Sequence, residues 1–248
     1  MTHALGIDIG GTGIKGAVVD TATGELVSER KKIATPKSGK PGAIVKVVVE
    51  LIEQLGGISE SMPVGVCFPA IVRNGMTMSA ANISDDWIGL EAEKLFEKAL
   101  GRDIHFVNDA DAAGVAEVRY GAAKGVPGLV LLTTLGTGIG SALIYNGVLV
   151  PNSELGHLQI GGRGAEKGAS FAAKERRHLS WAAWAKRLQR YYTHLELLFS
   201  PDLILVGGGV SKSHEKFLPL LKLTAPIVPA ELRNNAGILG AAALAVKE

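Results

Sequence analysis

The sequence has a single cysteine, few aromatic residues and no long apolar run. Cys67 is the only cysteine among 248 residues, which excludes a disulfide within the chain and a metal site built from several thiolates. It stands in the apolar run 64–70, so we expect a buried core residue. No stretch approaches about 18 unbroken apolar residues, and the first residues lack the pattern of a signal peptide. We therefore expect a cytoplasmic protein without a membrane partner.

Acidic residues are scarce between residues 163 and 190, where eight basic residues stand against two acidic ones. The whole chain carries 26 basic and 24 acidic side chains, so this positive charge is local. Basic residues on a helix usually form a solvated face, with aromatic side chains toward the core. A chain of phosphates would instead use them as a track of cations. Both interpretations stay open, whereas the helical spacing of the aromatic residues disfavours nucleic acid.

Glycine is abundant, with 32 residues, and part of it belongs to a motif that occurs twice. The sequence GTGIKGAVV at 11–19 returns as GTGIGSALI at 136–144. Each copy follows a short apolar run and leads into another, which predicts strand, glycine turn, strand. Such a turn leaves backbone N–H groups and a hydroxyl open to a bulky anion. Two of them facing one cleft would clamp phosphate.

Alternating strands and helices predict an α/β fold of two lobes with a central cleft. The lobes are predicted as 1–108 with 234–248, the smaller one, and 109–233. Apolar spacing predicts a helix that begins at Pro41 and stops at Gly56. Further helices are predicted at 90–100, 112–120, 181–199 and 236–246, and strands at 26–33, 64–68, 104–107 and 203–206, beside hairpins at 5–20 and 129–145.

Several polar residues allow both a structural and a chemical interpretation. Asn108, Asp109 and Asp111 head a predicted helix, where these residue types act as caps, but a carboxylate there also suits a general base. If Asp109 is the base, Asp111 is the better cap. His157 alone would more often be a structural histidine. Asp8, at the end of the first strand, either caps its own turn or holds Mg²⁺.

The glycine run 207–209 follows a predicted strand. It is either a tight connection to the next helix, which Ser211 would cap, or a place where a nucleotide approaches the backbone.

The order of these motifs resembles the ROK sugar kinases of the actin-like ATPase superfamily. The motifs are DIGGTGIK at 8–15, ND at 108–109, LGTGIG at 135–140, ELGH at 154–157 and VGGGV at 206–210. The resemblance runs from Leu5 to Ala245 and implies an actin-like (ribonuclease H-like) fold. Within the family, the stretches 108–114, 135–141, 151–152 and 184–186 are most similar to the polyphosphate-dependent glucokinases and glucomannokinases.

This resemblance implies a phosphotransferase that moves a phosphoryl group from inorganic polyphosphate or ATP to the 6-hydroxyl of glucose, with mannose as a further acceptor. Asp109 would be the general base. The implied hexose-binding residues are Asn82, Asn108, Asp109, Glu154, His157 and Glu166. The implied phosphate- and nucleotide-binding residues are Asp8, Gly10, Gly11, Thr12, Gly13, Lys15, Thr137, Gly138, Gly207, Gly208 and Gly209, with Asp8 also the Mg²⁺ ligand.

Typical members of this family carry a cysteine-rich zinc loop after the Glu-x-x-His segment, with its histidine as fourth ligand. Residues 161–170 contain no cysteine, so zinc is not expected and His157 is not supported as a metal ligand.

Two other functions stay open. The first is an ATP-dependent kinase of another hexose, such as an N-acetylhexosamine. The second is a non-catalytic sugar-sensing regulator, because the family also contains repressors; those carry a DNA-binding domain before the first glycine turn, where this sequence has only a handful of residues. The expected partners are a hexose and polyphosphate or a nucleotide, without nucleic acid, and the protein is expected as a monomer or homodimer whose lobes close on sugar.

Overall fold

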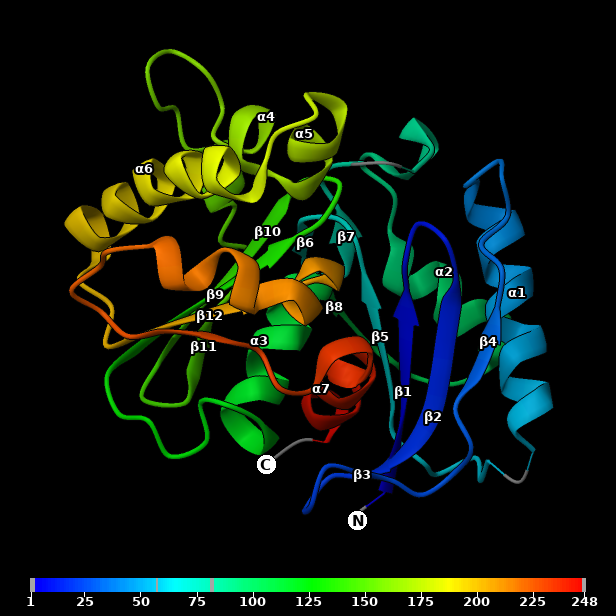
Figure 1. Ribbon diagram of the computed structural model, residues 1–248. Helices are drawn as coiled ribbons and strands as arrows, with labels where there is room; N and C mark the ends of the chain where they lie inside the picture. The colour runs from blue at the N-terminus through cyan, green and yellow to red at the C-terminus, as the bar shows by residue number, and fades with distance from the viewer. Residues whose placement is uncertain (1–2, 57, 81–82, 247–248) are drawn as a thin grey trace. The chain divides into compact units, whose positions relative to one another are not determined.

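A computed structural model of the protein describes residues 3–56, 58–80 and 83–246 (Figure 1). It divides into two compact units. The first unit is Met1–Ala116 with Asn235–Glu248, and the second unit is Glu117–Asn234. As functional lobes, 1–108 with 234–248 and 109–233 stay a prediction. None of the described helices is long and apolar enough to cross a membrane.

The first unit is built on a six-stranded sheet in the order β3-β2-β1-β5-β8, with β4 also paired to β2. Its strands are β1 (His3–Ile9), β2 (Ile14–Asp20), β3 (Glu25–Leu26), β4 (Lys31–Ile33), β5 (Val64–Phe68) and β8 (His105–Asn108). The β1–β2 pair is antiparallel, whereas β1, β5 and β8 run parallel. A small hairpin of β6 (Val72–Arg73) and β7 (Met76–Thr77) also belongs to this unit. The predicted first hairpin is confirmed.

The predicted continuous strand 26–33 is wrong, because a side chain interrupts the ladder. The hydroxyl of Ser28 accepts a hydrogen bond from the backbone N–H of Val18 at 2.9 Å, where a strand would offer a carbonyl. The chain therefore leaves the sheet after β3 and returns as β4.

One face of this sheet carries the main hydrophobic core of the unit. Leu5, Ile7 and Ile9 of β1 are fully buried and cluster with the apolar positions of α1 (Pro41–Leu55) and α2 (Ala92–Leu100). Side chains alternate between the faces of a strand, so the residues between these three point the other way. The predicted end of the first helix at Gly56 is confirmed.

The opposite face holds α7 (Ala236–Ala245) at very short distance. A Cβ built on Gly6 would stand 2.0 Å from the carbonyl oxygen of Ile238, and one on Gly65 would stand 1.9 Å from that of Ala241. Only glycine admits such an approach. Part of the glycine content thus serves helix packing rather than turns.

The second unit repeats the strand order of the first: an antiparallel hairpin followed by two parallel strands. Its sheet runs β11-β10-β9-β12-β13. The strands are β9 (Leu129–Leu135), β10 (Ile139–Tyr145), β11 (Val148–Val150), β12 (Leu203–Gly207) and β13 (Ile227–Pro229). The β9–β10 pair is antiparallel, and β12 runs parallel to both β9 and β13. The duplication read from the sequence is thereby confirmed at the level of topology.

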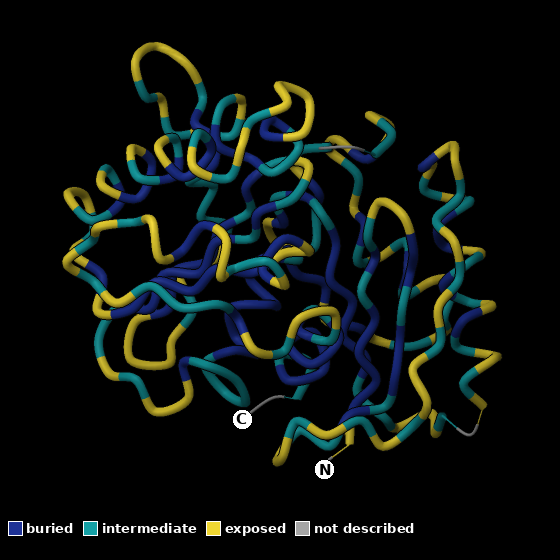
Figure 2. The backbone as a smooth tube through the Cα atoms, in the orientation of Figure 1, coloured by how far each residue is buried: buried dark blue, intermediate teal, exposed yellow. Residues whose placement is uncertain are grey.

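The long helix α6 (Trp181–Phe199) covers this second sheet with its aromatic face. Trp184, Tyr191 and Tyr192 are almost fully buried, and the Tyr192 hydroxyl lies 2.7 Å from the hydroxyl oxygen of Thr133 in β9. The predicted helix bounds are confirmed. Two short helices precede it, α4 (Glu166–Ala169) and α5 (Phe171–Arg176), which the sequence pattern did not indicate. Figure 2 shows the buried stretches along the strands and the exposed ones at turns and outer helix faces.

Candidate functional site

In the first unit, polar side chains gather at the carboxyl ends of the parallel strands. Asp8 of β1 pairs in register with Cys67 of β5, and Cys67 pairs with Val107 of β8. Asn108 ends β8, and the next residue, Asp109, begins α3 (Asp109–Tyr120). Ligands of open α/β sheets bind at such strand ends. The fold therefore brings two predicted site carboxylates, Asp8 and Asp109, to the same edge of one sheet.

Asp8 forms an ion pair with Lys15, which stands directly opposite it on β2. The Lys15 ammonium lies 2.9 Å from Oδ2 of Asp8, and the two side chains are only 22% and 16% exposed. The other oxygen, Oδ1, lies 3.7 Å from the sulfur of Cys67. Burial raises the pKa of the Cys67 thiol well above its usual range, and the negative charges of Asp8 and Asp109 raise it further. Cys67 is a buried free thiol, as predicted.

Asn108 is the cap of helix α3. Its Oδ1 accepts hydrogen bonds from the backbone N–H groups of Ala110 and Asp111 at 2.8 and 3.0 Å, and its Nδ2 donates to the carbonyl of Ala70 at 3.0 Å. The prediction that Asp111 is the better cap is wrong, because Asp111 already lies inside the first turn and is buried. Asn108 is itself buried, so it ties β8, the helix start and residue 70 together.

Asp109 is the first residue of α3 and keeps a partly exposed side chain. Its Oδ1 accepts a hydrogen bond from the N–H of Ala110 at 2.8 Å. The helix N-terminus stabilises a carboxylate in this place. The chain thus presents an oriented anionic oxygen pair at the strand edge.

The first glycine turn joins β1 to β2. The N–H of Gly10 donates to the carbonyl of Gly13 at 3.1 Å, and Thr35 donates its hydroxyl hydrogen to the carbonyl of Gly10 at 2.5 Å. A Cβ on Gly11 would meet no protein atom within 4 Å, and Gly11 and Thr12 are exposed. Asn82, a predicted sugar contact, lies outside the described residues.

The second glycine turn joins β9 to β10 and is linked to α4. Here the N–H of Gly136 donates to the carbonyl of Gly138 at 3.1 Å, while Thr137 is exposed. Oε2 of Glu166 accepts a hydrogen bond from the N–H of Ile139 at 3.3 Å, and a Cβ on Gly138 would stand 2.5 Å from that same oxygen. Gly138 therefore makes room for the Glu166 carboxylate.

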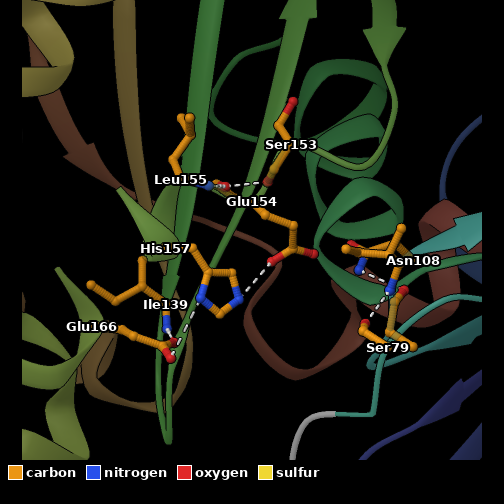
Figure 3. A network of polar contacts seen from close by, with 11 residues as sticks. Ser79, Asn108, Ile139, Ser153, Glu154, Leu155, His157 and Glu166 are labelled. Atoms are coloured by element: carbon orange, nitrogen blue, oxygen red, sulfur yellow. Dashed lines mark hydrogen bonds and ion pairs between the residues drawn. The ribbon is translucent and has the colours of Figure 1, made fainter. Parts of the chain in front are cut away.

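Two predicted sugar-binding carboxylates of the second unit, Glu154 and Glu166, flank the imidazole of a third predicted residue, His157 (Figure 3). Nε2 of His157 lies 3.9 Å from Oε2 of Glu154, and Nδ1 lies 3.9 Å from Oε1 of Glu166. The His157 side chain is 67% exposed, so it is not a satisfied core histidine. Burial raises the pKa of the Glu154 carboxyl, with His157 opposing and Glu166 adding to the rise.

The segment that carries Glu154 and His157 is held by contacts that sequence reasoning missed. The hydroxyl of Ser141 in β10 accepts a hydrogen bond from the N–H of Leu155 at 2.8 Å and donates one to the carbonyl of Ser153. A Cβ on Gly156 would stand 2.2 Å from the carbonyl oxygen of Ile139. Serine in an otherwise apolar strand was the available signal.

The glycine run after β12 has a structural reason of its own. Gly208 has φ +83°, and a Cβ there would stand 2.5 Å from the carbonyl oxygen of Leu135. The prediction that Ser211 caps the next helix is wrong, since Gly208 is the cap residue of the 3₁₀ segment 209–216. Ser211 instead lines a cavity of about 330 Å³ together with His214, Glu231 and Arg233.

Glu117 is a further residue that the sequence did not single out. It is fully buried in the second unit, and its carboxylate accepts hydrogen bonds from the N–H groups of Ala122 at 2.9 Å, Leu232 at 2.8 Å and Glu231 at 3.2 Å. Glu117 therefore holds in place Ala122 and Glu231, two of the residues that line the 330 Å³ cavity. Within the described ranges, no group of three or more His, Cys, Asp or Glu residues is arranged to hold a metal ion.

The sequence profile of the ROK family matches residues 4–170. The chain is 45% identical over 247 residues to a polyphosphate glucokinase of Mycobacterium tuberculosis (strain CDC 1551 / Oshkosh). The aligned region covers 99% of this chain and 92% of the relative. It is 45% identical over the same length to the polyphosphate glucokinase of strain H37Rv.

Solved structures of two kinases are similar to this chain. The inorganic polyphosphate/ATP-glucomannokinase from Arthrobacter sp. strain KM is 50% identical, with a TM-score of 0.93 over 98% of this chain and 97% of that one. A ROK family glucokinase from Streptomyces griseus, in complex with glucose and AMPPNP, is 26% identical, with a TM-score of 0.81 over 98% and 99%.

Proposed function

We propose that this chain, which belongs to the ROK family, transfers a phosphoryl group from inorganic polyphosphate or ATP to the 6-hydroxyl of glucose, with mannose as a second acceptor. The predicted family and actin-like fold are confirmed. The observation that carries the proposal is the 45% identity to a polyphosphate glucokinase over 99% of this chain, combined with carboxylates at the strand ends of the first unit.

Asp109 is proposed as the general base. In the transfer step, the 6-hydroxyl oxygen forms a bond to the terminal phosphorus, the bond between that phosphorus and the bridging oxygen of the donor breaks, and the hydroxyl proton passes to Asp109. The structure supports this role through a carboxylate that is partly exposed and oriented by the start of α3. Asn108, whose side chain is used in capping, is proposed to position Asp109 and to contact the sugar through its amide.

Glu154, His157 and Glu166 are proposed to bind the hexose hydroxyls. Two carboxylates, each 3.9 Å from an exposed imidazole, supply hydrogen-bond acceptors beside a donor, and sugar hydroxyls can pair with both kinds of group. A site built this way rejects analogues that leave one of its polar groups unpaired. Asn82 is proposed as a further contact.

Asp8 is proposed as the Mg²⁺ ligand. Mg²⁺ usually keeps several waters and takes one or two carboxylates together with substrate phosphates. Asp8 fits this donor set because its carboxylate lies at the end of β1, next to the first glycine turn. Its Oδ2 is already paired with the Lys15 ammonium, which favours contact with Mg²⁺ through water. When bound, Mg²⁺ neutralises charge on the transferring phosphates. No zinc site is proposed.

The two glycine turns are proposed to bind donor phosphates, through Gly10, Gly11, Thr12, Gly13 and Lys15 in the first unit and Thr137 and Gly138 in the second. The open space at Gly11 and Gly136 supports this, because nothing in the described chain fills it. When ATP is the donor, the adenosine is proposed to lie near Gly207, Gly208 and Gly209. We place the protein in the cytoplasm, where ATP is available, as a monomer or homodimer.

The test is glucose 6-phosphate formation with polyphosphate or ATP, measured in a coupled assay, with glucose, mannose and an N-acetylhexosamine as acceptors. We expect turnover of glucose with polyphosphate and with ATP. If only the N-acetylhexosamine is phosphorylated, it is the acceptor in place of glucose. If sugar binds but is phosphorylated with neither polyphosphate nor ATP, the result favours a sugar-sensing regulator.

A further inference from the structure

A cavity of about 350 Å³ lies in the second unit, apart from the cluster around His157. It is formed by the turn at 160–165, by α4 and by α6, which lie side by side in Figure 1. Its charged lining residues are Arg163, Lys167, Arg177, Arg187 and Arg190, and no acidic residue lines it among those described. Five cations therefore surround one small volume.

These cations are not neutralised by neighbouring carboxylates. Within residues 3–56, 58–80 and 83–246, no ion pair joins any of the five to an acidic side chain. Arg187 donates from Nη1 to the carbonyl of Gly168 at 3.2 Å, and the guanidinium of Arg190 packs over Gly161, where a Cβ would stand 3.0 Å from Nη2. Arginine stays charged in proteins, so the five charges repel one another until an anion enters.

A buried tyrosine lines the same cavity. Tyr191 is 1% exposed, and its hydroxyl has no hydrogen-bond partner in the part of the chain that the structure describes. Burial, and then the charges of Tyr192 and Glu166, raise the pKa of Tyr191 well above its usual value, so the hydroxyl keeps its hydrogen. Leaving a buried hydroxyl unpaired costs stability, and a phosphate oxygen that came within hydrogen-bond distance of the Tyr191 hydroxyl would relieve that cost.

The short helix α4 contacts both the cavity and the second glycine turn. Lys167, Gly168 and Ala169 of α4 line the cavity, while Glu166 of the same helix accepts the N–H of Ile139 at the end of the turn. The N–H of Ala172 also donates to the carbonyl of Gly136 at 3.0 Å. An anionic chain whose end occupies the turn thus finds the cavity on the neighbouring side of α4.

The lining favours repeated phosphates over nucleic acid. Bases of single strands stack on exposed aromatic rings. Here Trp184 and Tyr192 are fully buried, and Trp181 is covered by the ammonium of Lys174 at 4.4 Å and by the ring of Phe217. The cavity offers five cationic side chains, which match phosphate oxygens.

We propose that this cavity binds inner phosphates of the inorganic polyphosphate chain and is thereby a donor subsite that ATP does not use. The inference rests on the proposed function for the identity of the donor. The phosphate-binding groups that α6 contributes are then Arg187, Arg190 and Tyr191. Phosphate binding at this cavity also gives a reason for the concentration of positive charge between residues 163 and 190.

The test compares the double variant Arg187→Gln/Arg190→Gln with Lys186→Gln and Arg176→Gln, which remove exposed cations of the same segment that do not line the cavity. Charge-assisted hydrogen bonds contribute enough for each lost arginine to weaken binding about tenfold. In the double variant we expect the Kd and KM for long-chain polyphosphate to rise by about tenfold or more. The KM for ATP should change by less than about twofold, and the melting temperature by no more than a few degrees. Tyr191→Phe, which removes only the hydroxyl, raises the polyphosphate Kd by a smaller factor.

Chain length sharpens the test. Tripolyphosphate, which is too short to fill both the turn and the cavity, should lose less affinity than the long chain in the double variant. Equal polyphosphate Kd in the double variant and the Lys186→Gln control would overturn the inference, as would tighter wild-type binding of single-stranded RNA than of polyphosphate. Loss of polyphosphate binding in a protein inactive with every donor would uphold the inference and sink the proposed function instead.

Discussion

The two glycine hairpins share a topology but not a chemistry. Four residues separate Ile9 from Ile14 in the first, and three separate Leu135 from Ile139 in the second. Where the first hairpin pairs Asp8 with Lys15 across its strands, the second pairs Thr134 with Gly140. The second turn has no charged pair of its own strands and instead receives Glu166 from α4.

The duplicated turn thus provides the same backbone path in both units, and the neighbouring residues determine which ligand each turn can bind. The first hairpin carries a carboxylate suited to Mg²⁺, and α7 packs against its Gly6. The second hairpin has Leu132 at the place equivalent to Gly6 and lies next to the His157 cluster and the cationic cavity. Only one of the two hairpins is therefore expected to respond to metal.

The largest effect is expected outside both hairpins, at Asp109. Replacing Asp109 by Asn removes the proton acceptor but keeps the size and the bond to Ala110. We expect kcat for glucose phosphorylation to fall by about 10²–10⁴, the usual worth of general-base catalysis. Glucose affinity, measured by calorimetry, should change little. A variant with wild-type kcat would remove Asp109 from the chemistry.

The asymmetry between the hairpins predicts a metal effect in one of them only. Asp8→Asn should raise the Mg²⁺ concentration that gives half-maximal activity by about 10–100-fold, as loss of a ligand or its support does elsewhere. Thr134→Val, at the equivalent strand position, is the matched control and should leave that concentration unchanged. Titration of activity with Mg²⁺ measures both, and equal responses would show that the hairpins are interchangeable.

The packing of α7 distinguishes the hairpins in stability. Gly6→Ala places a Cβ against the backbone of Ile238, and overpacking of this kind costs about 1–3 kcal/mol. Gly11→Ala points its Cβ into open space and should change the free energy of unfolding by less than about 0.5 kcal/mol. Urea denaturation measures both variants. An unaffected Gly6→Ala protein would contradict the close approach of α7.

The smallest effect is the pH response of the cluster beside the second hairpin. Because burial raises the pKa of Glu154 in the folded protein, its stabilising contribution is present at acid pH and lost as the pH rises through that raised pKa. Glu154→Gln should therefore melt near the wild-type temperature in acid and above it at neutral pH. Melting curves across pH test this, and a difference that is constant with pH would refute it.

Much of the fold could be predicted because local signals agree with the final packing. Alternating apolar residues around Gly-Thr-Gly predict both hairpins, and the spacing of Trp184, Leu188 and Tyr192 predicts α6. Glu154 and His157, which the family motifs single out, lie 3.9 Å apart in the structure. The functional roles of these residues stay proposals.

What the sequence did not reveal depends on contacts between distant segments. Ser28 breaks a strand by accepting a backbone N–H, and Asn108 rather than Asp111 caps α3 because its amide also reaches Ala70. In the sequence, Glu117 has no feature that separates it from a solvent-exposed helix residue. Only the fold brings the backbone N–H groups of residues 231 and 232 to its carboxylate. The cationic cavity likewise needs α4 and α6 to meet.

The most direct test of the account is the identity of the product made from glucose and inorganic polyphosphate, determined by ³¹P and ¹H NMR. We expect phosphate on the 6-oxygen of glucose, a polyphosphate chain shortened by the transferred group, and no transfer when 6-deoxyglucose replaces glucose. Phosphate on another hydroxyl, or no phosphorylated sugar with either polyphosphate or ATP, would contradict it.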